Sequence, residues 1–231
     1  MTWVKICGIT NAADAINAVD AGADALGFVF YEKSPRFVDS LTAATIVAEL
    51  PAQIEKVGVF VDTPQERVAE IVNQVGLTAV QASLGSTTKS GNSKTAFARQ
   101  VRMLLPLSVT RLLGDERRLQ GLMAEFLRMA ESPKRLNTQD AFLLDSTAPD
   151  LPGGTGRPFD WQRIAPLVHI MNRSVKVVAA GGLNPGNVGA ALRILKPWGV
   201  DVSTGVEAEP GRKDHGKVRA FVRAVREAEK N

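Results

Sequence analysis

The chain has 231 residues, of which 45% are hydrophobic and 23% are charged, and its formal net charge is +4. This near-average composition excludes a disordered or collagen-like chain, and no dense basic stripe indicates a nucleic-acid partner. A single cysteine cannot form an internal disulfide, no secretion signal opens the sequence, and no apolar run reaches the roughly 18 residues of a membrane span. We therefore expect a soluble cytoplasmic protein without a membrane partner.

Short apolar runs alternate with amphipathic helical patterns along the whole chain. In chain order, the runs predict strands over 4–7, 25–30, 56–61, 78–81, within 101–109, 141–144, 175–179 and 199–202. The helices between them are expected to begin at Asn11, near Ser40, at Thr63, near Asp115, at Asp160, at Asn184-Pro185 and at Asp214. The clearest helix has Thr63 as its expected cap, Pro64 at its first position and Gly76 at its end. The polar stretch 83–95 is predicted to be a loop.

Eight strand–helix units without a linker predict a single (β/α)₈ barrel, also called a TIM barrel, with residues 1–231 forming one domain. A doubly wound open sheet is the alternative for such an alternation. That fold would favour a Gly-x-Gly-x-x-Gly turn after the first strand, and Cys7-Gly8-Ile9-Thr10 is not one.

In such a barrel the active site lies at the C-terminal ends of the strands. The side chains expected there include Cys7, Asp62, Gln81 and Asp145, with Arg36 on the second loop. Cys7 alone fits a small buried residue, and Asp145 alone fits a helix cap or a loop residue. Together they suit a base and an acid, which requires the thiol pKa to be lowered and the carboxyl pKa to be raised.

Glycine-rich turns follow the last two predicted strands, where barrels commonly bind phosphate through backbone N–H groups. The residues expected to bind an anion are Gly181, Gly182, Ser203, Thr204 and Gly205. The alternative is that both turns are only tight connections.

A third glycine-rich loop, Gly153-Gly154-Thr155-Gly156, lacks the Gly-Lys-Ser/Thr ending of a nucleotide-binding loop. We interpret it as a flap over a ligand, with an ordinary surface loop as the alternative. Neither His169 nor His215 ends a strand, so both are expected to be surface or packing residues. No metal site is predicted.

Several motifs occur in order from Val4 to the last helix, and they resemble the phosphoribosylanthranilate isomerase family. They are Lys5-Ile6-Cys7-Gly8-Ile9-Thr10, Gly27-Phe28-Val29-Phe30 with Ser34-Pro35-Arg36, Val59-Phe60-Val61-Asp62, Leu144-Asp145 with Gly153-Gly154-Thr155-Gly156, Ala180-Gly181-Gly182-Leu183-Asn184-Pro185, and Asp201-Val202-Ser203-Thr204-Gly205-Val206-Glu207.

The resemblance implies an Amadori rearrangement of N-(5-phosphoribosyl)anthranilate in tryptophan biosynthesis. It implies that Asp145 is the general acid, that Cys7 is the general base and that Arg36 holds the carboxylate of the substrate. The turns after the last two strands would bind the phosphate, and Gly154 would contact the substrate. The substrate is a small phosphorylated and carboxylated molecule, and no cofactor is implied. The oligomeric state is left open.

The chain departs from the family pattern on two strands. Where the family usually reads Gln-Leu-His-Gly, this chain reads Gln81-Ala82-Ser83-Leu84-Gly85, and the fifth strand lacks the usual basic pattern. An altered pocket wall is therefore expected. The alternatives are a histidine-pathway or bifunctional phosphoribosyl isomerase, and a non-catalytic barrel that binds a phosphorylated ligand. The histidine-pathway family carries aspartate at the end of its first strand, so Cys7 argues against that choice.

Overall fold

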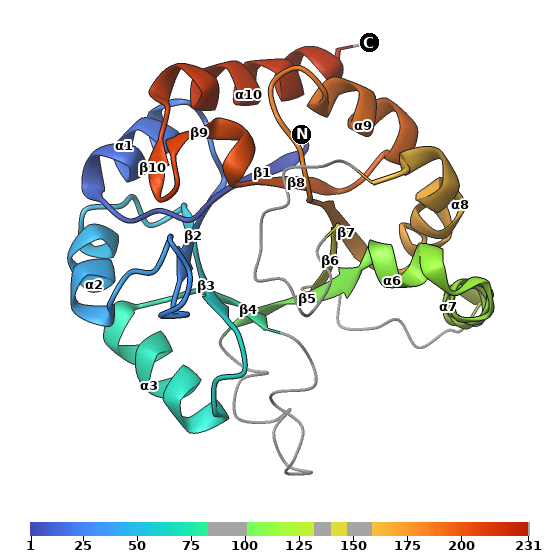
Figure 1. Ribbon diagram of the computed structural model, residues 1–231, viewed down its shortest axis with the longest axis horizontal. Coiled ribbons are helices and arrows are strands. Elements are labelled where there is room, and N and C mark those ends of the chain that lie inside the picture. The colour runs from blue at the N-terminus through green and yellow to red at the C-terminus, as the bar shows by residue number, and fades with distance from the viewer. Residues whose placement is uncertain (83–100, 132–139, 147–158, 231) are drawn as a thin grey trace.

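Eight parallel strands close into a barrel in the order in which they occur along the chain (Figure 1). The computed structural model describes residues 1–82, 101–131, 140–146 and 159–230. The strands are β1 (Trp3–Cys7), β2 (Ala25–Val29), β3 (Glu55–Phe60), β4 (Ala79–Ala82), β5 (Arg102–Ser108), β6 (Ala141–Asp145), β7 (Lys176–Ala179) and β8 (Gly199–Val202). Pairing of β1 with β8 closes the ring, which confirms the predicted (β/α)₈ barrel.

Helices surround the ring of strands on its outer side (Figure 1). They are α1 (Ala12–Asp20), α2 (Ser40–Ala48), α3 (Gln65–Val75), α6 (Val109–Gly114), α7 (Glu116–Glu131), α8 (Trp161–Met171), α9 (Val188–Leu195) and α10 (His215–Ala228). After β8 the chain forms the short helix η1 (Thr204–Val206) and a hairpin of β9 (Glu207–Glu209) and β10 (Arg212–Lys213), which the sequence did not predict. No helix in the described ranges is long and apolar enough to cross a membrane.

Most of the predicted helix starts are confirmed by side-chain caps. Asn11 accepts a hydrogen bond from the backbone of Asp14, Asp160 accepts one from Arg163, and Asp214 accepts one from Lys217. These acceptors satisfy N–H groups that a helix start leaves without partners.

Two predicted helix starts are wrong. Thr63 does not cap α3, because the cap position is Pro64 and the helix begins after it. The Thr63 hydroxyl donates to the carbonyl of Val61. The helix expected at Asn184-Pro185 begins only at Val188. The side chain of Asn187 accepts a hydrogen bond from the backbone of Asn184, which closes a turn ahead of the helix.

Alternate residues of β1 face opposite sides of the barrel wall, as in any strand. Val4 and Ile6 belong to the apolar cluster that packs under the surrounding helices, whereas Trp3 belongs to a separate cluster with inward residues of the other strands. Trp3, Lys5 and Cys7 therefore form an inward column. We call the N-terminal end of the strands, at Trp3, the floor, and the C-terminal end, at Cys7, the mouth.

Candidate active site

The middle of the inward column is a completely buried lysine. Lys5 Nζ donates to Asp201 Oδ1 of β8 at 2.9 Å and to Gln81 Oε1 of β4 at 3.1 Å, so its contacts span the barrel interior. Burial by itself lowers the pKa of Lys5, but the Asp201 carboxylate and the Cys7 sulfur outweigh this and raise the pKa above its ordinary value. The lysine is therefore a permanent cation inside the barrel.

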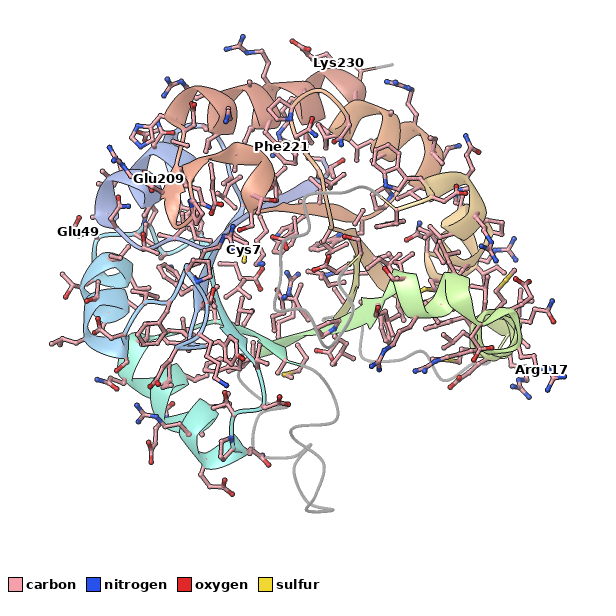
Figure 2. All side chains as sticks on the ribbon, in the orientation of Figure 1. Cys7, Glu49, Arg117, Glu209, Phe221 and Lys230 are labelled. Carbon is pink, nitrogen blue, oxygen red and sulfur yellow. The ribbon has the colours of Figure 1, made fainter. Side chains whose placement is uncertain are left out.

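Cys7 ends the column at the mouth, and Figure 2 shows its sulfur on the inner side of the ring of strands. Burial raises the pKa of the Cys7 thiol, while the nearby Lys5 ammonium and, more weakly, that of Lys213 act in the opposite direction. The net direction is upward, so the expectation of a lowered thiol pKa is wrong for the unliganded protein. At neutral pH the thiol is the prevailing form.

Gly27 of β2 makes the room that the thiol and the lysine occupy. It is the register partner of Cys7, and a Cβ atom at this position would lie 2.7 Å from Cys7 Sγ and 3.0 Å from Lys5 Cε. Any side chain here would displace one of the two groups.

Arg36, on the loop after β2, is held by the hairpin that follows β8. Its Nε and Nη2 donate to the two carboxylate oxygens of Glu207 at 2.8 and 2.7 Å, and Lys213 Nζ donates to Glu207 Oε1 at 2.9 Å. Burial alone raises the pKa of Glu207, but the hydrogen bond from Arg36 and the charge of Lys213 outweigh it and lower the pKa. Glu207 is therefore an anion that fixes two cations.

Gly8 brings Arg36 close to the loop after β8. Its φ of 79° lies in the left-handed region that favours glycine. A Cβ atom here would lie 2.6 Å from Arg36 Cδ and 3.1 Å from Ser203 Oγ. The side chains of Arg36 and Ser203 thus flank the residue that follows Cys7.

A small cavity of about 60 Å³ opens beside these groups, between the ends of β6, β7 and β8. It is lined by Asp145, Ser146, Ala180, Gly181, Gly182, Leu183, Asp201, Val202, Ser203 and Thr204. The cavity therefore gathers the predicted acid and four of the five residues predicted to bind an anion. Asp201 also belongs to its wall, which connects the cavity to the buried Lys5.

The backbone of the two glycine-rich turns has little freedom to change. Gly181 has a φ of 78°, and a Cβ atom on it would lie 2.6 Å from the backbone nitrogen of Ser146. A Cβ atom on Gly205, the fifth predicted anion-binding residue, would collide with the carbonyl oxygen of Leu183. Ser203 Oγ is buried and has no hydrogen-bond partner among the described residues. It is thus an uncommitted polar group at the cavity.

Other predicted residues lie apart from the cavity. Gly154 falls outside the described residues. Asp62 is exposed at the end of β3. His169 contacts the carbonyl of Ile194 and His215 contacts Asp14, as expected for packing residues. Over the described ranges, no group of three or more His, Cys, Asp or Glu side chains is placed to hold a metal ion.

Comparison with known proteins identifies the family. The family model for N-(5'phosphoribosyl)anthranilate (PRA) isomerase matches residues 4–224. The chain belongs to this family. An N-(5'-phosphoribosyl)anthranilate isomerase from Pelobacter propionicus is 43% identical over 229 residues, which cover 98% of this chain and 97% of that protein.

Solved structures of the family agree with the fold. The crystal structure of phosphoribosyl anthranilate isomerase from Thermotoga maritima has a TM-score of 0.79 and 36% identity, covering 98% of this chain and 100% of that one. A second isomerase structure, in complex with reduced 1-(o-carboxyphenylamino)-1-deoxyribulose 5-phosphate, has a TM-score of 0.76 and 34% identity, with the same coverage.

Sequence reasoning gave no role to the charged residues that hold the site together. Lys5 and Asp201 pair inside the barrel, and Glu207 and Lys213 pair behind Arg36. The signal was present in part, because Lys5 interrupts an apolar inward-facing strand and such a buried charge requires a partner. The strand that supplies the partner is not apparent from the sequence.

Proposed function

We propose that the chain catalyses the Amadori rearrangement of N-(5'-phosphoribosyl)anthranilate to 1-(2-carboxyphenylamino)-1-deoxyribulose 5-phosphate, a step of tryptophan biosynthesis. The observation that carries the proposal is the cavity, in which the Asp145 carboxyl group shares a wall with the Gly181-Gly182 turn and with Ser203 and Thr204. An acid next to an anion site suits a sugar phosphate. Family membership supplies the substrate class.

The phosphate of the substrate would bind at the glycine-rich turns after β7 and β8. Backbone N–H groups of Gly182, Thr204 and Gly205 would donate to the phosphate oxygens, since glycine allows an anion to approach the backbone closely. The hydroxyl of Ser203, which has no partner among the described residues, would donate a further hydrogen bond. Gly154 stays a predicted contact on the flap.

The anthranilate carboxylate would bind Arg36. Glu207 occupies Nε and Nη2 of the guanidinium and leaves Nη1 outside this pair. A planar guanidinium can bind a second carboxylate along its remaining edge, and the first pair fixes the plane. Glu207 would therefore position Arg36 without competing for the whole group.

The reaction would proceed in two proton transfers. Asp145, protonated, gives its proton to the ribose ring oxygen, the bond between that oxygen and C1 breaks, and the nitrogen lone pair forms a C1=N iminium. The Cys7 thiolate then removes the proton from C2, and the electron pair of that C–H bond forms the enolamine, which tautomerises to the ketone. The substrate nitrogen is the electron sink, so no cofactor is required.

The raised pKa of the Cys7 thiol agrees with this order of events. Before ring opening, burial favours the protonated thiol. The iminium would place a positive charge beside the sulfur, which lowers the thiol pKa at the moment when a base is needed, and the thiol proton would pass to water before the thiolate takes the proton from C2. The intermediate would thus help to create its own base. We further propose that the enzyme is one domain and acts in the cytoplasm, where a lone thiol stays reduced.

Isomerisation of phosphoribosylanthranilate by the purified protein tests the proposal directly. We expect turnover of this substrate and none of the larger aminoaldose of the histidine pathway. Turnover of the histidine-pathway substrate alone would replace the proposed activity, and turnover of neither would leave a non-catalytic phosphate-binding barrel.

The assigned roles are tested by Cys7→Ala and Asp145→Asn. Each is expected to reduce kcat by about 10²-fold or more while binding of a phosphorylated product analogue survives. The control is Asp140→Asn at the opposite end of β6, where the carboxylate accepts the backbone N–H of Met103 at 3.0 Å and its charge acts on Arg102 of the floor. Normal rates in both active-site variants would refute the roles even if the wild type is active.

A further inference from the structure

We propose that Lys5 is a positioning residue that makes the Cys7 thiolate available as a base, and that Asp201 holds Lys5 in place and limits its effect. The link to catalysis rests on the proposed function. The effect on the thiol does not, because it is a property of the unliganded protein.

Lys5 and Cys7 are neighbours because of the alternation of side chains along a strand. They are two residues apart on β1, so both face inward, and both border Gly27 of β2. The Cβ position of Gly27 lies 3.0 Å from Lys5 Cε and 2.7 Å from Cys7 Sγ, so the two side chains converge on the same gap.

The hydrogen bonds of Lys5 point to the same conclusion. An ammonium group has three N–H donors. Asp201 and Gln81 accept two of them at 2.9 and 3.1 Å, and the Cys7 sulfur lies across the gap at Gly27 from the Lys5 side chain, where the ammonium charge acts on it. An ammonium next to a sulfur stabilises the thiolate over the thiol.

Other charges act on the thiol from neighbouring elements. Asp201 on β8 disfavours the thiolate, whereas Lys213 on β10 favours it more weakly than Lys5 does. Lys213 is already paired with Glu207 at 2.9 Å, and Glu207 in turn holds Arg36. Lys5 is thus the cation with the most direct access to the sulfur.

Packing alone is a poor reason for this ion pair. Lys5 is completely buried and Asp201 is nearly so. Removing two charges from water costs about as much as their attraction returns, and apolar residues of similar volume often serve a core equally well. The pair is better explained by what it does to the thiol above it.

The experiment measures the thiolate of Cys7 against pH in the full chain, by absorbance at 240 nm relative to Cys7→Ser and by the rate of alkylation with iodoacetamide. Because Cys7 is the only cysteine, both signals report this site alone. Lys5→Met is expected to reduce the alkylation rate at neutral pH by about tenfold or more, and Asp201→Asn to increase it several-fold. The acid limb of the profile of kcat/KM against pH should shift to higher pH in Lys5→Met and to lower pH in Asp201→Asn.

The matched control is Lys56→Met. Lys56 is also a buried lysine, but it lies on β3 and donates to the carbonyls of Pro51 and Ala52, away from the thiol. This variant is expected to leave the thiol titration unchanged. If Lys5→Met does not fold, the uncharged pair Lys5→Met with Asp201→Asn replaces it, and alkylation is expected to stay slower than in the wild type.

If the Cys7 thiol of Lys5→Met titrated as it does in the wild type, the proposal would be overturned. A double variant that is alkylated as fast as the wild type would also overturn it. A shift in the same direction in Lys5→Met and Asp201→Asn would also overturn it. The expected shifts in a protein that proves to lack isomerase activity would instead refute the proposed function and leave this inference standing.

Discussion

Among the described residues, two largely buried arginine–glutamate pairs lie at opposite ends of the barrel, and their surroundings differ. At the mouth, Arg36 binds Glu207 through two nitrogens, and the side chains are 12% and 6% exposed. At the floor, Arg102 binds Glu55 at 2.6 Å, and the side chains are 12% and 19% exposed. The floor guanidinium also lies 4.7 and 4.9 Å from the ring centres of Trp3 and Trp198.

The difference agrees with the proposed binding role of Arg36 and with a structural role for Arg102. The rings of Trp3 and Trp198 stack with their centres 5.2 Å apart, and Lys176 Nζ lies 4.7 Å from the ring centre of Trp198. Aromatic rings and a second cation therefore surround Arg102. At the mouth, Arg36 is fixed along one edge by Glu207, next to Gly8 and the cavity loops. An ion pair closed by rings contributes to stability, whereas one with an open edge can accept a ligand.

The largest expected effect is at the floor. Trp3→Ala removes a buried ring that stacks on Trp198 and supports Arg102, so the free energy of unfolding should fall by about 3 kcal/mol or more. The kcat of the folded enzyme should not change, because Trp3 is two layers below Cys7. Urea unfolding and steady-state kinetics check both statements. Loss of turnover at full stability would break the distinction between the two ends.

The same substitution at the two arginines should give crossed results. Arg102→Met leaves Glu55 buried without its cation, and we expect the free energy of unfolding to fall by about 1–3 kcal/mol with KM unchanged. Arg36→Met leaves Glu207 paired with Lys213, so stability should hold while KM rises about tenfold or more. Each variant is the control for the other. Equal effects on KM would show that the floor also acts in binding.

The smallest expected effect is on the pH dependence of stability. Burial raises the pKa of Glu55 despite Arg102, so the folded state binds its proton more readily than the unfolded state does. The pKa of Glu207 is lowered, so the unfolded state binds the proton more readily there. As the pH falls from about 6 to about 3.5, the free energy of unfolding of the wild type should therefore rise relative to that of Glu55→Gln. Over the same range it should fall relative to that of Glu207→Gln.

Urea midpoints across this range, measured for the wild type and both glutamine variants, give the two differences. Glu55 and Glu207 are both glutamates paired with an arginine, so opposite changes would show that the surroundings of the two pairs determine the pH dependence. Differences that change in the same direction with pH would show that the two pairs are electrostatically alike.

Much of the fold follows from local pattern. Apolar runs of strand length, capped helices such as those at Asn11 and Asp214, and the absence of a Gly-x-Gly-x-x-Gly turn were enough to predict the barrel. The hairpin after β8 was not predicted, because its strands are only three and two residues long and carry little pattern. The expected Thr63 cap failed because the helix begins one residue later, with Pro64 at the cap position, and the Thr63 hydroxyl donates to the carbonyl of Val61.

The candidate site also has a part that the sequence could predict and a part that it could not. Cys7 and Asp145 could be placed at strand ends by locating where each apolar run stops. The partners of Lys5 lie 76 and 196 residues away, at Gln81 and Asp201, and only the closed register brings them together. The upward direction of the thiol pKa depends on burial, which is a property of the assembled barrel.

Gly27 limits which reactive groups the first strand can carry. Barrel interiors are close-packed, and a residue on one strand determines how large its neighbour on the next strand can be. Glycine is already the smallest residue, so β2 cannot recede further to admit a larger group at position 7. A side chain clearly larger than cysteine at this position would therefore require Lys5 or the backbone to move.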